Sequence, residues 1–214
     1  MKLGELIEIT SANNPNIRLR VYRGHFATSH SHMNYYIDVA ANKASLKQTR
    51  EIARELADRY RLSAEVDTIL CLDGSEVIGA FIADRLAKPD YYGINADKDI
   101  SVLTPERING SQLFFRDNTA PMLDGKKVLI LAVSIVTGYT AQSAVEAVRY
   151  YNGMPVGICS IFSNLEDCVG IPVNSVFGAD DLPGYESHLS IHCPMCKEGE
   201  KITALVNSFG VSAI

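Results

Sequence analysis

The sequence contains no tryptophan, no excess of positive charge and no long apolar run. Its 20 Lys and Arg residues are outnumbered by 25 Asp and Glu, which gives a net charge of −5, whereas electrostatic binding of nucleic acid needs a basic surface. No apolar run approaches the roughly 20 residues of a membrane span, and the first residues lack the apolar centre of a signal peptide. We therefore expect a cytoplasmic protein without a nucleic-acid or membrane partner.

Cysteine is also scarce. The five cysteines are scattered apart from one pair, which does not make a disulfide framework in a chain of this length. Apolar residues are plentiful, at 47% of 214 residues, and this is enough for one full α/β core with small appendages. We predict three segments: an N-terminal segment at 1–42, an α/β core at 43–180 and a C-terminal tail at 181–214.

The most informative stretch is 126–151. Residues 128–133 form an unbroken aliphatic run, which is typical of a strand buried on both faces of a parallel sheet. A turn at 137–140 and an amphipathic helix at 141–151 follow. Backbone N–H groups at a helix N-terminus have no intrahelical partner and attract phosphate. The turn residues Thr137, Gly138, Tyr139 and Thr140 therefore predict a phosphate site, although doubly wound proteins without that function also contain such units.

A second strand, turn and helix precede the first, at 68–72, 73–76 and 77–86. Carboxylates in this turn would repel a diphosphate unless Mg²⁺ lay between them; the alternative is a structural Asp-Gly turn with a capping pair. The turn residues are Asp73, Gly74, Ser75 and Glu76. The order of units predicts a parallel sheet with helices on both faces, and both turns then lie at the carboxyl ends of strands, where ligands bind.

The remaining pattern predicts shorter elements. An amphipathic helix is expected at 43–60, strands at 17–22, 100–103 and 155–162, and a short edge strand at 174–177. Two more helical segments are expected, one around Leu3, Leu6 and Ile7 and one closing the chain at 201–209. Residues 104–123 have turn residues at both ends and an apolar centre, which favours a hairpin or flap.

The unit at 126–151 resembles the phosphoribosyl-pyrophosphate motif of type I phosphoribosyltransferases. The resemblance implies that residues 137–140 hold a ribose 5′-phosphate and that residues 73–76 form the pyrophosphate loop. The family places two adjacent acidic residues at the end of the strand, where they hold the ribose hydroxyls. Counting back from Gly138, this sequence has Ala132 and Val133 at those positions.

The hairpin expected at 23–38 resembles the N-terminal hood of orotate phosphoribosyltransferases. That family carries a lysine in the hood turn, where this sequence has Thr28 and Ser29. The family also has a mobile catalytic flap at the place of 104–123. The resemblance makes Arg107 and Arg116 the candidate catalytic residues, since either guanidinium can neutralise a diphosphate leaving group. Surface charges or salt-bridge partners are the alternative for each.

Histidine and cysteine suggest a metal site in the tail. His188, His192, Cys193 and Cys196 occur within nine residues, and the spacing of the cysteines matches a zinc knuckle. Reduced structural thiols and a redox pair are the alternatives. A second group, His25, His30 and His32, has no carboxylate or cysteine nearby in sequence, and solvated surface histidines are the default interpretation for it. A metal site and a contact with the base or phosphate in the hood are the alternatives.

The combined prediction is a phosphoribosyltransferase-like α/β protein with a parallel-sheet, Rossmann-like core, an N-terminal hood and a Cys-containing tail. The resemblance implies transfer of phosphoribose from phosphoribosyl pyrophosphate, with Mg²⁺, to a nucleobase such as orotate, by a homodimer. The missing acidic pair supports an alternative, a non-catalytic regulatory protein that binds a phosphoribosyl compound or a nucleotide.

Overall fold

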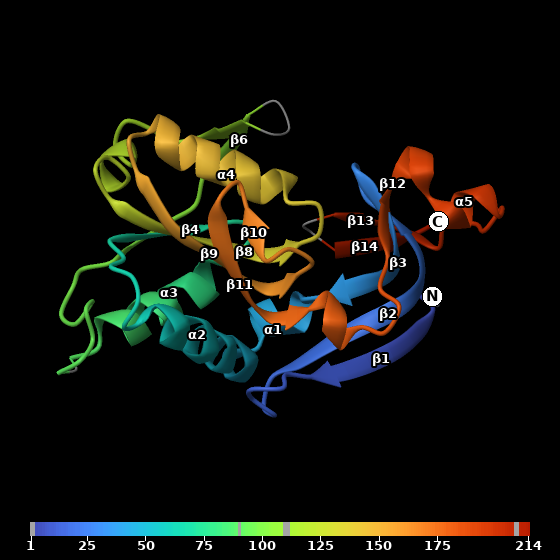
Figure 1. Cartoon of the computed structure of the whole chain (residues 1–214), viewed down its shortest axis with the longest axis horizontal. Coiled ribbons are helices and arrows are strands. Elements are labelled where there is room, and N and C mark those ends of the chain that lie inside the picture. The colour runs from blue at the N-terminus through green and yellow to red at the C-terminus, as the bar shows by residue number, and fades with distance from the viewer. Residues whose placement is uncertain (1–2, 90, 109–111, 208–209) are drawn as a thin grey trace.

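The computed structural model describes residues 3–89, 91–108, 112–207 and 210–214. Its centre is a sheet in the order β10-β11-β9-β8-β4-β5, in which all neighbours pair in parallel except β10 with β11 (Figure 1). The strands span Thr68–Cys71 (β4), Ser101–Leu103 (β5), Lys127–Ile135 (β8), Met154–Ser163 (β9), Asp167–Cys168 (β10) and Ile171–Gly178 (β11). This confirms the predicted α/β fold with a parallel sheet.

Helices cover both faces of this sheet because its central strand is apolar on both. Alternate residues of β8 point to opposite faces: Leu129 and Leu131 belong to the core beneath helices α2 and α3, and Val128 and Ile130 belong to the core beneath α4. The helices span Leu46–Tyr60 (α2), Glu76–Ala87 (α3) and Tyr139–Tyr150 (α4). Strands β6 (Glu106–Ile108) and β7 (Gln112–Phe114) pair antiparallel in the predicted flap.

A second sheet forms the hood. Its order is β12-β3-β2-β13-β14, and β1 also pairs with β2. The strands span Glu5–Thr10 (β1), Arg18–Ala27 (β2), Ser31–Asp38 (β3), Ser187–Leu189 (β12), Ala204–Asn207 (β13) and Gly210–Ala213 (β14). The short helices α1 (Ala40–Ala44) and α5 (Pro194–Lys197) adjoin it, and single 3-10 turns lie at Ala120–Met122, Ala179–Asp181 and Ser190–His192. Residues from both ends of the chain therefore build one hood.

Two helix predictions are wrong. The segment around Leu3, Leu6 and Ile7 contains strand β1, in which Ile7 and Ile9 are the half-buried residues that pack against the core. The predicted closing helix at 201–209 contains strand β13 at Ala204–Asn207, residues 201–203 before it are irregular, and residues 208–209 lie outside the described residues. Ala204 of β13 is fully buried opposite Phe26 of β2. Pairing with β2, which is far away in sequence, makes this segment a strand. Its own four residues fit a helical or a strand period equally well.

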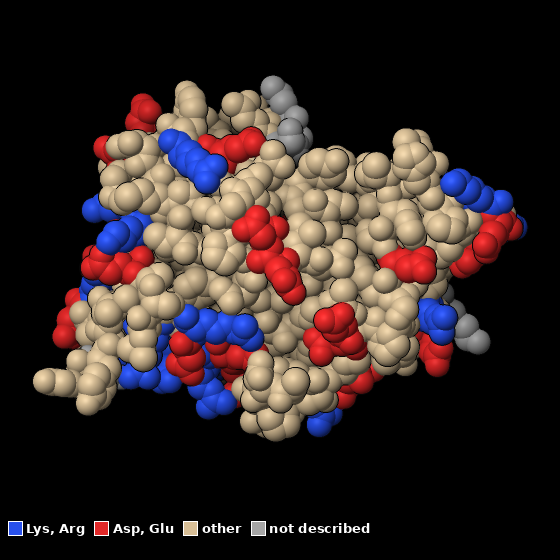
Figure 2. Space-filling model, viewed as in Figure 1, with Lys and Arg blue, Asp and Glu red and all other residues tan. Residues whose placement is uncertain are grey.

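Charged residues of both signs are mixed on the face that Figure 2 shows, over α2 and α3 in particular. Ion pairs such as Arg85–Asp58 join these two helices. Among the described residues, no helix is both long and apolar enough to cross a membrane.

Candidate functional site

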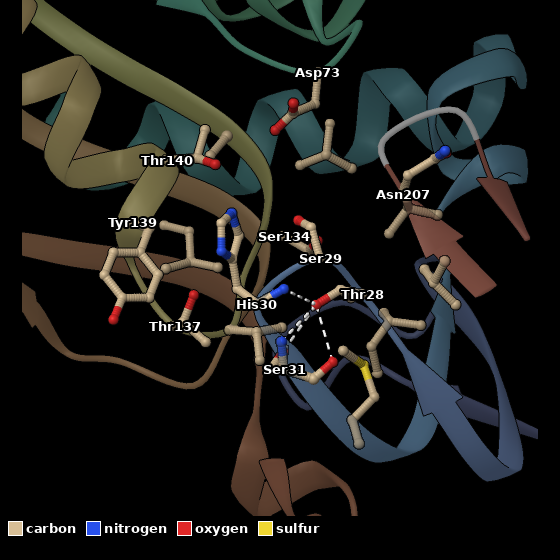
Figure 3. Close-up of a pocket in the computed structure, with 18 of the residues that line it drawn as sticks. Thr28, Ser29, His30, Ser31, Asp73, Ser134, Thr137, Tyr139, Thr140 and Asn207 are labelled. Carbon is tan, nitrogen blue, oxygen red and sulfur yellow. Dashed lines mark hydrogen bonds between the residues drawn. The ribbon is translucent and has the colours of Figure 1, made fainter. Parts of the chain in front are cut away.

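The two predicted phosphate turns meet at one edge of the central sheet. Strand β4 has β5 on one side and β8 on the other, so the connections leave β4 and β8 in opposite directions and open a crevice at their carboxyl ends. A cavity of about 670 Å³ lies there. Figure 3 shows Asp73 and Thr140 from the core, His30 from the hood and Asn207 from β13 around it.

The turn after β8 has the conformation that a phosphate-binding loop needs. Gly138 precedes helix α4 with a φ of 80°, which is in the left-handed region that favours glycine. A Cβ atom at this position would lie 2.8 Å from Leu165 Cδ1. The Gln142 N–H is the donor to the Gly138 carbonyl, at 2.8 Å, so the three N–H groups before it have no acceptor within the helix. They lie beside the cavity with the hydroxyls of Thr137 and Thr140.

The end of strand β8 carries no acidic residue. Ala132 and Val133, the counterparts assigned from the sequence, are buried, with 1% and 3% exposure. The next residue, Ser134, is exposed and lines the cavity (Figure 3). The polar side chain that this strand end offers to a ligand is therefore a hydroxyl.

The turn after β4 brings together two cations. Arg107 Nη2 lies 3.0 Å from Asp73 Oδ1, and Lys43 Nζ donates to the Asp73 carbonyl at 2.9 Å. Asp73 and Gly74 both have positive φ, at 56° and 75°. All four residues line a side cavity of about 370 Å³, and Lys43, Asp73 and Arg107 also line the main cavity. With two cations against the one carboxylate of Asp73, the turn carries a net positive charge, which attracts an anion.

Lys43 was not predicted as a site residue. The sequence places it at the start of the helix expected at 43–60, whereas it lies in the short helix α1, which a break at Ser45 separates from α2. No local pattern marks this lysine, because its role depends on a turn 30 residues away.

Three other predicted site residues lie away from the cavity. The Ser75 hydroxyl is buried and donates to the Leu131 carbonyl at 3.3 Å, and Glu76 accepts from the Thr104 hydroxyl at 3.0 Å. Arg116 forms an exposed two-bond pair with Glu106 across the flap, at 2.6 and 2.8 Å. These contacts give each residue a structural partner, so the cavity depends on Arg107 and not on Arg116 for its flap cation.

The hood supplies the opposite wall. The Thr28 hydroxyl accepts from the N–H groups of His30 and Ser31 and donates to the Ser31 carbonyl, which holds the hairpin tip in shape (Figure 3). The His30 ring lies 5.5 Å from the Tyr139 ring, so hood and phosphate turn are in contact. Burial raises the pKa of Tyr36, which also lines the cavity, to about 12. Its phenol is therefore protonated at neutral pH.

Comparison with known proteins agrees with this geometry. No protein-family profile matches the chain. It is 26% identical over 192 residues to an orotate phosphoribosyltransferase of Sulfurimonas denitrificans, covering 83% of this chain and 88% of the relative. It is 26% identical over 179 residues to that of Desulforamulus reducens, covering 82% and 84%.

Solved structures give the same answer for the fold. The chain matches Mycobacterium tuberculosis orotate phosphoribosyltransferase with a TM-score of 0.53 and 19% identity, over 77% of this chain and 93% of that one. The chain has a type I phosphoribosyltransferase fold. Leishmania donovani adenine phosphoribosyltransferase matches with a TM-score of 0.52 and 19% identity, over 71% and 73%. The resemblance inferred from the phosphate turn is thus confirmed, and the sequence of this phosphoribosyltransferase-like chain is similar to orotate phosphoribosyltransferases.

The cysteine pair lies outside the cavity and has different histidine neighbours from those predicted. His25, His32, Cys193 and Cys196 each place one nitrogen or sulfur atom within 4.8 Å of the others. Of the predicted ligands, His188 instead contacts Glu186 at 3.1 Å, and His192 is exposed in a 3-10 turn. His30 also lies apart, at the cavity. The histidines beside Cys193 and Cys196 are therefore His25 and His32, and not the expected His188 and His192, because the hood hairpin folds against the tail.

The other three cysteines are buried and reduced: Cys71, Cys159 and Cys168. Burial raises the pKa of the Cys71 thiol to about 12 and also raises that of Cys159. Thiols of such high pKa are poor nucleophiles at neutral pH. These cysteines serve the packing of the core.

Proposed function

We propose that this chain binds phosphoribosyl pyrophosphate, or a nucleotide through its 5′-phosphate, and transfers phosphoribose to a nucleobase. One observation carries the proposal: a helix N-terminus suited to phosphate and a turn flanked by Lys43 and Arg107 line the same cavity. Its volume of about 670 Å³ suits a ligand of this size. The homodimer implied by the resemblance and the cytoplasmic location expected from the sequence stay predictions.

In this proposal the 5′-phosphate binds the turn at 137–140. The N–H groups at the start of α4 and the positive end of the helix dipole supply the attraction, and the hydroxyls of Thr137 and Thr140 add donors. Ser134, at the end of β8, then lies on the side where the ribose hydroxyls would be. These are positioning and electrostatic contributions, which are what phosphoribosyl transfer chiefly needs from side chains.

The diphosphate binds the Asp73 turn between Lys43 and Arg107. In the described part of the chain, Asp73 is the carboxylate that lines the cavity, and Arg107 already neutralises it. Mg²⁺ prefers few protein carboxylates together with substrate oxygens, so this donor set fits a magnesium ion carried by the diphosphate. Asp73 would hold that ion, whose charge would stabilise the leaving group.

The nucleobase binds beneath the hood. From Ala27 to Val39 the hood sequence contains no lysine or arginine, so the wall offers the Ser29 hydroxyl and the His30 imidazole in place of a fixed positive charge. A carboxylate on the base would lack a strong partner there. We therefore propose that uncharged nucleobases are accepted at least as well as orotate.

The alternative is a non-catalytic protein that binds the same compounds and regulates another process. The observation that favours it is that Ala132 and Val133, both buried, stand at the strand end where the family has acidic residues. Loss of two charge-assisted hydrogen bonds to the ribose costs on the order of 3 to 6 kcal/mol of transition-state stabilisation. This corresponds to about 10²- to 10⁴-fold in rate. A binding protein does not need that stabilisation.

Calorimetric titration tests the binding site. The Lys43→Gln variant should bind phosphoribosyl pyrophosphate about 10- to 100-fold more weakly, because one charge-assisted contact is lost, and should bind ribose 5-phosphate within about 2-fold of the parent. Lys47→Gln, on the exposed side of α2, is the matched control and should change neither affinity. Equal loss for both ligands in Lys43→Gln would contradict the assignment of the diphosphate to the Asp73 turn.

A turnover assay separates the enzyme from the binding protein. Phosphoribosyl pyrophosphate, Mg²⁺ and a panel of bases including orotate, uracil, adenine and hypoxanthine are incubated with the protein, and pyrophosphate release is measured. Release that depends on a base supports the transferase. Tight binding without release supports the regulatory protein, and the absence of any binding refutes both.

A further inference from the structure

The four residues His25, His32, Cys193 and Cys196, here called the His/Cys cluster, lie on the hood and tail, apart from the cavity lining. In β3, Ser31 and Met33 line the cavity, and His32 between them points to the opposite face. Figure 1 shows α5, which contains Cys196, beside the hood sheet at the end of the molecule remote from α2 and α3. The cluster therefore forms a site of its own.

The distances within the cluster fit a tetrahedral metal centre. Zinc bonds of ordinary length place two nitrogens about 3.3 Å apart and a nitrogen and a sulfur about 3.6 Å apart. Here His25 Nε2 and His32 Nδ1 are 3.0 Å apart. Cys193 Sγ and Cys196 Sγ lie 3.6 and 3.7 Å from His25 Nε2, and Cys196 Sγ lies 3.2 Å from His32 Nδ1. One ion at the centre would reach all four atoms with little movement.

The surroundings orient His25 as a ligand. Its other ring nitrogen, Nδ1, lies 3.0 Å from the Glu200 carbonyl. A carbonyl oxygen only accepts, so Nδ1 carries the hydrogen and the Nε2 lone pair of the neutral ring faces the cluster. This is the outer hydrogen bond that metal-binding histidines commonly make. Gly199, with a φ of 78°, closes the turn that brings Glu200 back to His25.

Three of the four residues of the His/Cys cluster are buried. His25 is fully buried, Cys193 is 1% exposed and His32 is 8% exposed. We propose that the cluster binds one Zn²⁺ through His25 Nε2, His32 Nδ1 and the two cysteine sulfurs. Two thiolates and two imidazoles are an ordinary ligand set for structural zinc. Binding displaces one proton from each thiol, and the charge of two thiolates balances that of the ion.

The ion ties the tail to the hood beside the cavity. The Thr203 N–H donates to the His25 carbonyl, and strand β13 begins at the next residue and pairs with β2. Leu205, Val206 and Asn207 of β13 line the cavity. Zinc therefore fixes the wall that β13 contributes, although its ligands do not touch that space.

Metal analysis of the whole chain tests the proposal. Protein purified without chelators should contain about one zinc per chain, and Cys196→Ser and His32→Ala should contain less than about a fifth of that. Cys196 is exposed, so its replacement leaves no hole in the core. His188→Ala and His192→Ala are the matched controls and should keep the parent's zinc. Loss of zinc in the controls with retention in His32→Ala would overturn the ligand assignment.

Cobalt substitution keeps the test decisive if a variant fails to fold. The parent chain, stripped of zinc under reducing conditions and loaded with Co²⁺, should give the intense visible absorption of a tetrahedral site and a near-ultraviolet thiolate band. Zinc removal should lower the Tm by about 5 °C or more. Protein with neither zinc as purified nor a tetrahedral cobalt spectrum would refute the proposal.

Discussion

Replacing Gly138 by alanine should destabilise the fold more than the same change at a glycine of equal conformation. Gly138 has a φ of 80°, and Gly170, in the two-residue turn between β10 and β11, has a φ of 81°. An alanine in the left-handed region costs about 1 kcal/mol at either place. Only at Gly138 does the new Cβ meet a neighbour, Leu165 Cδ1, at 2.8 Å; nothing lies within 4 Å at Gly170.

The expected magnitudes follow from these contacts. Moving the Leu165 side chain adds about 1 kcal/mol, so Gly138→Ala should lose about 2 kcal/mol of unfolding free energy and Gly170→Ala about 1 kcal/mol. For a chain of this length these losses correspond to about 4–8 °C and 2–4 °C in Tm. Urea denaturation of both variants, of Leu165→Ala, and of Gly138→Ala combined with Leu165→Ala measures the contact as a coupling energy.

The same variants test the phosphate site. Gly138→Ala shifts the N–H groups of the turn and should weaken ribose 5-phosphate binding at least about 10-fold, whereas Gly170→Ala should leave it unchanged. Equal stability losses in the two variants would refute the packing argument. Unchanged affinity in Gly138→Ala would refute the assignment of the turn.

Three further predictions concern the core and the strand end. Burial raises the pKa of the Asp67 carboxyl, but its bonds with Lys98 and a backbone N–H outweigh this and lower the pKa. Asp67→Asn should therefore cost about 1 kcal/mol of unfolding free energy at pH 7. Urea denaturation at several pH values should show this difference shrinking below pH 3.8. Tyr60→Phe removes a buried bond to the Ile158 carbonyl and should cost about 1 kcal/mol in urea denaturation. Ser134→Asp should raise the rate of base-dependent pyrophosphate release at least about 10-fold if the missing carboxylate limits it; a lower rate would contradict that account.

The central sheet was predictable because its signals are local. The apolar run of β8 and the amphipathic pattern of α2 depend on residues that are neighbours in sequence, and both elements lie where they were expected. The two turns were predicted to meet from the direction of parallel strands alone, and Asp73 and Thr137 line one cavity.

The hairpin of β2 and β3 was predicted, but the C-terminal strands of the hood and the proposed metal ligands were not predictable in the same way. Strand β13 exists because Ala204 pairs with Phe26, and no pattern within four residues encodes such a partner. Sequence proximity favoured His188 and His192 as ligands, whereas tertiary packing brings in His25 from β2. The place of Lys43 in the site was likewise not predictable from the sequence, since it depends on the contact of Lys43 with the Asp73 carbonyl.

The crystal structure of the chain with ribose 5-phosphate tests the central claim most directly. The account predicts the phosphate within hydrogen-bond distance of the backbone N–H groups of Tyr139 and Thr140, with the ribose toward Ser134. The Gly170→Ala crystal should show the same ligand, and the Gly138→Ala crystal should show reduced occupancy. A phosphate bound elsewhere, with the turn at 137–140 unoccupied, would contradict the account.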